Sequence, residues 1–308
     1  MASVNKRIAS FGEAMVEFFD RGDDCWRRGF AGDSLNVAWA LRALLPKSYA
    51  VDYVTRVGED GVSSDFVSFL EESDLGTGCI SRDSNRTLGL YTIKTDEQGE
   101  RSFDYWRSQS AAKCVADDPR ALKEALAGFE WVYLSGISAA IIEAKGRENL
   151  LEVIESLRTQ GVKFAYDPNF RPKLWSSLDE MRDFTQHMTR LSSLVMPTFD
   201  DELAAFGDST PEATAERLLN CGAEQVVVKN GTQPTLVANH SALQSYAVEQ
   251  PVKPLDTTGA GDSFNGGFLS AYLQGDSLER AVHRGQLISA RVVLHRGALV
   301  PYEELRKI

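Results

Sequence analysis

The nine-residue stretch DTTGAGDSF, which begins at Asp256, holds the residue types that phosphoryl chemistry needs. Two glycines and an alanine precede an apolar run at helical spacing, which predicts a tight loop that enters the N-terminus of a helix. There, Gly259, Ala260 and Gly261 would present backbone N–H groups to an anion. Asp262 would repel that anion, so its expected role is to accept a proton from a hydroxyl group that attacks a phosphate. A short glycine motif is weak by itself, and the alternative is an ordinary turn with a capping aspartate.

Length and charge limit the class of protein. The chain has 308 residues, of which 43% are hydrophobic, enough for one large or two small domains with a sizeable core. It has no apolar run of about 18 residues, and the polar residues 1–7 do not resemble a signal peptide, so we expect a cytoplasmic protein without a membrane span. A net charge of −11 argues against nucleic-acid binding through a basic surface, although local arginines can still bind a small anion.

Cysteine, histidine and glycine spacing exclude several kinds of site. The four cysteines are scattered without a Cys-x-x-Cys pair, so we expect reduced thiols, mostly buried, and no disulfide framework. The four histidines have no partner at metal-ligand spacing, so we expect neither a zinc site nor a catalytic histidine. No Gly-x-x-x-x-Gly-Lys-Ser/Thr loop occurs, which excludes a P-loop enzyme.

Short apolar runs alternate with amphipathic segments along most of the chain, which is typical of an α/β fold with a mainly parallel sheet. Core strands are expected over Ile8–Gly12, Val51–Val57, Trp131–Leu134, Lys163–Asp167, Ser193–Met196 and Gln225–Lys229. Helices are expected over Leu35–Leu44, Ser63–Glu72, Arg147–Gln160, Glu212–Asn220, Ser263–Leu273 and Leu278–Leu294.

Two regions, at about residues 13–31 and 87–107, break this alternation and predict a small additional β-sheet. They contain strand-like runs without intervening helices at Val16–Phe19, Leu90–Ile93 and Phe103–Trp106. Between the last two runs, Thr95–Gly99 predicts a hairpin turn.

Two arginines suggest that the ligand carries a carboxylate. Arg171 follows the predicted strand Lys163–Asp167, and open α/β sheets bind ligands at the carboxyl ends of their strands. Arg107 ends the second irregular region. Arginine's forked donors match a carboxylate, whereas a neutral sugar does not need them. Alternatively, Arg107 is a solvated strand residue and Arg171 caps a loop.

The stretch DTTGAGDSFxxG resembles the C-terminal signature of the ribokinase-like (PfkB) carbohydrate kinases. Further motifs of that family occur in the expected order: GDSLNVA from Gly32, VGED from Val57, VKxG from Val228 and RGA from Arg296. The resemblance implies one kinase domain over residues 1–308, with a Rossmann-type three-layer α/β/α core and the small sheet as a lid over the sugar. Lid sheets in this family often pair between subunits, so a homodimer or higher homo-oligomer through the lid is expected.

The same resemblance implies the roles of individual residues. Asp262 would be the catalytic base, with the anion hole at Gly259, Ala260 and Gly261. Substrate would contact Gly32, Asp33, Asn36, Tyr91, Tyr105, Arg107 and Arg171, and ATP would contact Thr198, Lys229, Gly231, Gly259 and Gly261. Without the family, Asn36 is equally well a residue at a helix start, and Lys229 a solvated residue at a strand end.

Two cation sites also follow from the resemblance. The family often arranges water around Mg²⁺ with Asn-x-x-Glu, but Thr198 and Asp201 stand at those positions here. Because of this departure, either Asp201 or Glu202 could hold Mg²⁺ through water. Alternatively, these acidic residues only begin a helix, where negative charge suits the helix dipole. The family often binds a monovalent cation near the residues that correspond to Asp256 and Gly297, which leaves potassium dependence open.

Longer matching stretches narrow the resemblance to the 2-keto-3-deoxygluconate kinases of this family. They include GFAGDSLN from Gly29, YWR from Tyr105 and DPNFRPKLW from Asp167. The resemblance implies ATP-dependent phosphorylation of the C6 hydroxyl of that sugar acid. A kinase of the same fold for fructose, ribose or a nucleoside and a non-catalytic sensor of a sugar acid or a nucleotide remain alternatives. A Rossmann oxidoreductase is disfavoured, because the glycine-rich loop lies near the C-terminus rather than after the first strand.

Overall fold

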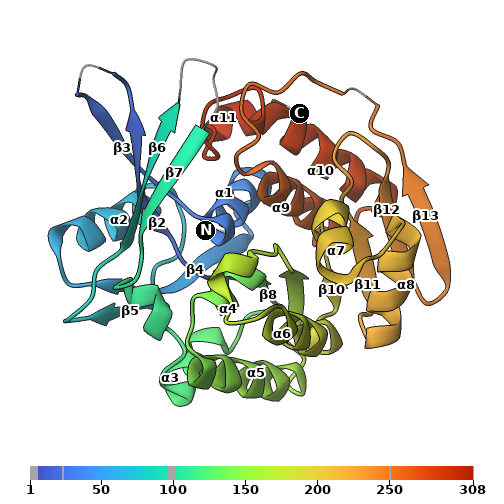
Figure 1. Ribbon diagram of the computed structural model, residues 1–308, viewed down its shortest axis with the longest axis horizontal. Coiled ribbons are helices and arrows are strands. Elements are labelled where there is room, and N and C mark those ends of the chain that lie inside the picture. The colour runs from blue at the N-terminus through green and yellow to red at the C-terminus, as the bar shows by residue number, and fades with distance from the viewer. Residues whose placement is uncertain (1–5, 23, 96–100, 250, 308) are drawn as a thin grey trace.

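The computed structural model describes residues 6–22, 24–95, 101–249 and 251–307. A nine-stranded sheet runs through the core in the order β13-β12-β11-β10-β9-β8-β1-β4-β5 (Figure 1). Its strands are β1 (Lys6–Phe11), β4 (Tyr49–Gly58), β5 (Ile80–Asp83), β8 (Trp131–Ser135), β9 (Lys163–Asp167), β10 (Leu194–Val195), β11 (Gln225–Val228), β12 (Thr235–Asn239) and β13 (Ala242–Tyr246). All neighbouring pairs are parallel except β11–β12 and β12–β13, which are antiparallel.

Helices cover both faces of this sheet, as the predicted α/β class requires. Successive residues of β8 point into different cores: Val132 and Leu134 pack in one cluster, and Trp131 and Tyr133 in the other. The first cluster includes residues of α3 (Pro119–Leu126), α5 (Ala144–Arg158), α6 (Leu178–Leu191) and α8 (Pro211–Cys221). The second includes residues of α1 (Asp33–Leu44), α2 (Gly61–Glu72), α9 (Ala260–Tyr272) and α10 (Leu278–Val292). Burial on both faces explains why the core strands are nearly continuous apolar runs.

The two irregular regions form a second, four-stranded sheet, here called the small sheet. Its order is β3-β2-β6-β7, with β2 (Met15–Asp20), β3 (Trp26–Ala31), β6 (Gly89–Thr95) and β7 (Arg101–Trp106). It projects from the core at the upper left of Figure 1, and β2 follows β1 after only three residues. The predicted hairpin turn at Thr95–Gly99 falls almost entirely outside the described residues.

The predicted core strands and helices are present, with boundaries that differ by a few residues. The difference that matters most is at α9, which begins at Ala260 rather than at the predicted Ser263. Glycine and alanine therefore form the first helical turn instead of a preceding loop. The predictions omitted the strands β5, β12 and β13, and the helices α3, α4 (Gly136–Ala140), α6, α7 (Phe199–Phe206) and α11 (Tyr302–Leu305).

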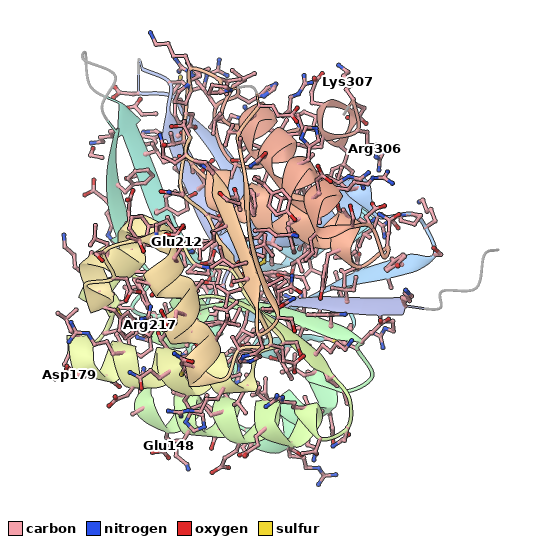
Figure 2. All side chains as sticks on the ribbon, turned by 90° about the vertical axis from the view of Figure 1, so that its right-hand side faces the viewer. Glu148, Asp179, Glu212, Arg217, Arg306 and Lys307 are labelled. Atoms are coloured by element: carbon pink, nitrogen blue, oxygen red, sulfur yellow. The ribbon has the colours of Figure 1, made fainter. Side chains whose placement is uncertain are left out.

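The outer helices carry the polar surface. Glu148 on α5, Asp179 on α6 and Glu212 on α8 are exposed (Figure 2). The four cysteines are free, but the expectation that most are buried is wrong, because Cys25 is exposed and the other three are only partly buried. Among the described residues, no helix combines the length and apolar character needed to cross a membrane.

Candidate active site

The carboxyl ends of the parallel strands face the small sheet across a cleft of about 860 Å³, here called the large cleft. β1, β8, β9 and β11 are all parallel within one sheet, so the residues that follow them meet at the same edge. Most predicted site residues line this cleft: Gly32, Asp33, Asn36, Tyr91, Tyr105, Arg107, Arg171, Thr198, Asp201, Lys229, Gly259, Ala260, Gly261 and Asp262.

The first turn of α9 forms one wall of the large cleft. Gly259 precedes the helix in the left-handed conformation, with φ of 72°, and a Cβ atom there would lie 2.5 Å from the Cβ of Ala298. Both constraints favour glycine. Ala260 donates its N–H to the carbonyl oxygen of Thr257 at 3.2 Å, whereas the described hydrogen bonds leave the N–H groups of Gly259 and Gly261 unused. Of the three predicted anion-hole residues, these two glycines therefore have N–H groups available for a phosphate.

Asp262 is the third residue of α9 and lies at the base of the cleft. The side-chain amide of Asn36 donates to Asp262 Oδ2 at 2.8 Å. The pKa of Asp262 is raised to about 7: burial is the main cause, the negative charge of Asp33 adds to it, and the hydrogen bond from Asn36 opposes both. A carboxyl group with this pKa can accept a proton near neutral pH and release it again.

Asp33 is the second carboxyl group beside this base. It begins α1, and its Oδ2 accepts hydrogen bonds from the Ser135 hydroxyl and, at 3.4 Å, from the Asn169 amide. Burial raises the pKa of Asp33, and the hydrogen bond from Ser135 opposes that rise. Two carboxyl groups thus share a poorly solvated space, which disfavours simultaneous ionisation of both.

Lys229 follows β11 and is held by a buried ion pair. Its Nζ lies 2.6 Å from Asp167 Oδ2, and the exposed fractions of the two side chains are 8% and 3%. Asn265 on α9 donates to the same Oδ2 at 2.7 Å. The ammonium group also lies 3.5 Å from where a Cβ of Gly261 would stand, so its charge reaches the first turn of α9.

A second, more apolar cavity of about 360 Å³, here called the side cavity, adjoins the large cleft. Thr198, Lys229, Thr257, Ala260 and Gly261 line both spaces and so mark their junction. Gly231, which has φ of 56°, lines only the side cavity. The apolar part of the side cavity comes from residues that the sequence predictions did not include: Val248, Pro251, Val252, Pro254, Phe264, Ala290 and Val293.

The two predicted carboxylate-binding arginines differ in their surroundings. Arg107 forms an ion pair with the buried carboxylate of Glu13, which leaves little of its charge uncompensated. Arg171 donates to the carbonyl oxygen of Phe170 at 2.7 Å and lies 3.9 Å from Asp201, with 51% of its side chain exposed. Lys173 also lines the large cleft. Arg171 is therefore the arginine with more capacity for an anionic ligand.

The two predicted tyrosines lie on adjacent antiparallel strands of the small sheet. Tyr91 on β6 pairs with Tyr105 on β7, and their ring centroids are 5.7 Å apart. Tyr91 is buried and donates its hydroxyl to Glu17, whereas Tyr105 is 54% exposed. Tyr105 thus has the freer hydroxyl and ring of the two.

The two predicted cation sites differ in how the structure arranges their residues. Asp201 lines the large cleft, and burial raises its pKa while the charge of Arg171 opposes that rise. Glu202 is fully buried beside Arg217, 2.5 Å from its Nη2, and does not line the cleft. Asp256 and Gly297 are brought together, because the N–H of Gly297 donates to Asp256 Oδ2 at 2.6 Å.

The predicted site residues leave out six polar residues of the large cleft: Glu13, Asp167, Asn169, Lys173, Thr257 and Thr258. Glu13 follows β1 by two residues, and Asp167 ends β9 just before Asn169. The rule that placed Arg171 at a strand's carboxyl end would have selected these residues too. The ion pairs that engage Glu13 and Asp167 depend on contacts between distant segments and have no sequence signal.

Known proteins resemble this chain over nearly its whole length. Residues 5–305 match the profile of the pfkB family carbohydrate kinases. The protein named 2-dehydro-3-deoxygluconokinase of Escherichia coli (strain K12) is 39% identical over 308 residues, which covers 98% of this chain and 99% of that protein. The protein of the same name from Dickeya dadantii (strain 3937) is 38% identical and covers 97% of this chain and 98% of its own length.

Solved structures of that family have the same fold. A PfkB protein from Polaromonas sp. JS666 superposes with a TM-score of 0.85 at 26% identity, over 98% of this chain and 99% of that one. Aminoimidazole riboside kinase from Salmonella enterica, solved with aminoimidazole riboside and an ATP analog, has a TM-score of 0.84 at 20% identity, over 98% of this chain and 99% of that one, a likeness in fold alone. The profile match, the identities and the fold agree: the chain belongs to the pfkB family of carbohydrate kinases.

Proposed function

We propose that this protein transfers the γ-phosphoryl group of ATP to the C6 hydroxyl of 2-keto-3-deoxygluconate, the sugar acid also called 2-dehydro-3-deoxygluconate. The observation that carries the proposal is the position of Asp262, whose carboxyl group has a pKa of about 7 beside the junction of two cavities. The names of the relatives that are 38–39% identical support the choice of sugar acid.

The sugar acid would occupy the large cleft beneath the small sheet, which serves as the lid. Arg171 would bind the carboxylate with its forked donors, and Lys173 would add a second positive charge at that end. The buried amide oxygen of Asn36 has no partner among the described residues and can accept a hydrogen bond from a sugar hydroxyl. Arg107 would support the site through Glu13 and add less to carboxylate binding than Arg171.

ATP would place its base in the apolar side cavity and its phosphates at the junction. The N–H groups of Gly259 and Gly261 would receive the transferring phosphoryl group, with Lys229 as the nearest fixed cation. Asp167 and Asn265 keep that ammonium group at the junction. Thr198 and Gly231 would lie along the nucleotide.

In the reaction, the C6 oxygen attacks the γ-phosphorus as its proton moves to Asp262. A new oxygen–phosphorus bond forms while the bond between the γ-phosphorus and the bridging oxygen of ADP breaks, so ADP leaves with that electron pair. Because the base must be ionised to accept the proton, the raised pKa places the active form above about pH 7.

Two cations complete the proposal. The partly buried carboxylate of Asp201 suits Mg²⁺ held through water, since oxygen ligands and retained waters are what this ion prefers. Bound Mg²⁺ would offset phosphate charge, and Glu202 is a poorer candidate because Arg217 already pairs with it. We also propose that a monovalent cation binds near Asp256 and Gly297. Turnover should then be higher in potassium chloride than in tetramethylammonium chloride at equal ionic strength.

A coupled assay of ADP release tests the central proposal. With Mg²⁺ and ATP, we expect turnover on 2-keto-3-deoxygluconate and little on fructose, ribose or adenosine. Asp262→Asn should lose about 10²–10⁴-fold in kcat. Arg171→Gln should weaken binding of the sugar acid far more than that of a neutral sugar. Equal losses on both sugars would contradict the carboxylate contact, and near-normal turnover by Asp262→Asn would contradict the base.

The exposed Trp106 of β7 supports association through the small sheet. It is 59% exposed, and it alternates along the strand with Phe103 and Tyr105, so it lies on the face away from the large cleft. Light scattering with size-exclusion chromatography would reveal a homodimer, and Trp106→Ser should weaken it. An unchanged mass in that variant would place any interface elsewhere.

A further inference from the structure

A third cavity lies beside the large cleft, on the same face of the small sheet. Its volume is about 350 Å³, and we call it the arginine cavity because Arg21, Arg27 and Arg296 line it. Arg27 on β3 lies opposite Phe19 on β2, and both point to the face that carries Tyr91. From the small sheet, the arginine cavity is lined mainly by β2 and β3, together with Ile93 of β6. The large cleft is lined by β6 and β7 together with Met15 and with Ala31, which lines both spaces.

The charge of this cavity is unusual for an acidic protein. The chain has a net charge of −11, yet the charged residues lining this cavity are three arginines and Glu17, a local net charge of +2. Within the part of the chain that the structure describes, the three guanidinium groups make no ion pair or side-chain hydrogen bond, although most other arginines do. Unpaired positive charge gathered in a concave space favours a small anion.

The floor of the cavity is rigid and aromatic. Trp39 on α1 stacks on Phe69 of α2 with a centroid distance of 5.5 Å and an interplanar angle of 4°. Its indole N–H donates to the carbonyl oxygen of Val300 at 2.7 Å, which fixes the ring to the C-terminal segment. A ligand with a hydroxylated chain between anionic groups can therefore pack that chain on the ring while the arginines bind its charge.

The three arginines come from two parts of the molecule. Arg21 and Arg27 belong to the small sheet and its turn, while Arg296 precedes Gly297, whose N–H binds Asp256 at the start of the catalytic stretch. A ligand that contacts both parts would tie the small sheet to the core.

From these observations we propose that the arginine cavity is a second ligand site, separate from the catalytic one, for a small phosphorylated sugar acid. The phosphoryl group would lie among the guanidinium groups, because each can present two parallel N–H donors to it. The hydroxylated chain would lie over Trp39. Glu17, which accepts a hydrogen bond from Tyr91, would separate this ligand from the large cleft.

The test uses the full chain and 6-phosphogluconate as the probe, with binding followed by calorimetry and by tryptophan fluorescence. We expect saturable binding that weakens about tenfold in Arg27→Gln and in Arg296→Gln, as the loss of a charge-assisted contact predicts. Arg28→Gln is the matched control, because Arg28 is the next residue on β3 and pairs with Asp65 at 2.8 Å on the opposite face. Trp39→Phe should lose the fluorescence change but keep the heat of binding.

Further arms separate this site from the catalytic one. Binding should persist in Arg171→Gln and should slow amide hydrogen exchange in β2 and β3. Loss in Arg171→Gln with retention in Arg27→Gln would assign the probe to the large cleft and overturn the proposal. Equal weakening by Arg28→Gln, equal binding of gluconate, or a cavity found covered by a second copy of the chain would overturn it too. None of these outcomes depends on which sugar the kinase phosphorylates.

Discussion

Replacing Asp262 by asparagine should make the protein less active and more stable. Burial, together with the negative charge of Asp33, raises the pKa of this carboxyl group from 3.8 to about 7, so ionising it in the folded protein costs free energy. At 1.36 kcal/mol per pH unit, that difference corresponds to about 4 kcal/mol once the group is fully ionised. The side chain is partly exposed to the cleft, so we expect a smaller gain of about 1–3 kcal/mol in Asp262→Asn.

The pH dependence identifies the cause of this gain. Below the unfolded pKa near 3.8 the carboxyl group is protonated in both states, and the penalty is absent. As pH rises toward 7, the unfolded chain ionises first and the folded protein loses stability relative to it. The advantage of Asp262→Asn should therefore grow between about pH 4 and pH 7 and level off above pH 7.

Urea unfolding of both proteins across that range, followed by circular dichroism, measures the free energy of unfolding. Asp200→Asn is a suitable control, since Asp200 is exposed on α7. If Asp262→Asn exceeds the wild type in free energy of unfolding by the same amount at pH 4 and pH 8, or is less stable than the wild type at pH 8, the reasoning is refuted. In either case, Asp262 would not be a buried carboxylate whose ionisation destabilises the folded protein.

Three further results are expected. For the wild-type enzyme, kcat/KM should rise about tenfold from pH 5 to pH 6 and level off above about pH 8, as a base with a pKa of about 7 requires; a flat profile would exclude Asp262 as that base. Lys229→Met should cost about 3–5 kcal/mol of stability in urea unfolding, because it leaves Asp167 buried without its partner. Adding Asp167→Asn to this variant should recover part of the loss. Strictly additive losses would argue against the ion pair. Gly259→Ala should lower turnover and should reduce stability by about 1–3 kcal/mol, because φ is 72° and the new Cβ would lie 2.5 Å from a side-chain atom. Gly275→Ala is the control: its φ is 85° and the space around it is open, so turnover should not change.

The sequence by itself determined the fold class and most of the cleft. Apolar runs of strand length predicted the core strands because a parallel sheet buries both faces, and the period of the amphipathic segments predicted the helices. The glycine-rich stretch before Asp262 predicted a helix N-terminus, and together with the family resemblance it predicted a base. The rule that ligands bind at the carboxyl ends of strands predicted from the sequence that Arg171 lies in the site.

Only the tertiary structure decided how the charges in the site are shared. Arg107 and Arg171 are equivalent in sequence, but one is paired with Glu13 and the other is half exposed, because their neighbours come from distant segments. Asp201 and Glu202 are adjacent on α7, yet helical geometry turns one toward the cleft and the other toward Arg217. A pKa depends on burial and on charges brought close by folding, so a base with a pKa near 7 becomes visible only when Asp33 and Asp262 lie in the same cleft.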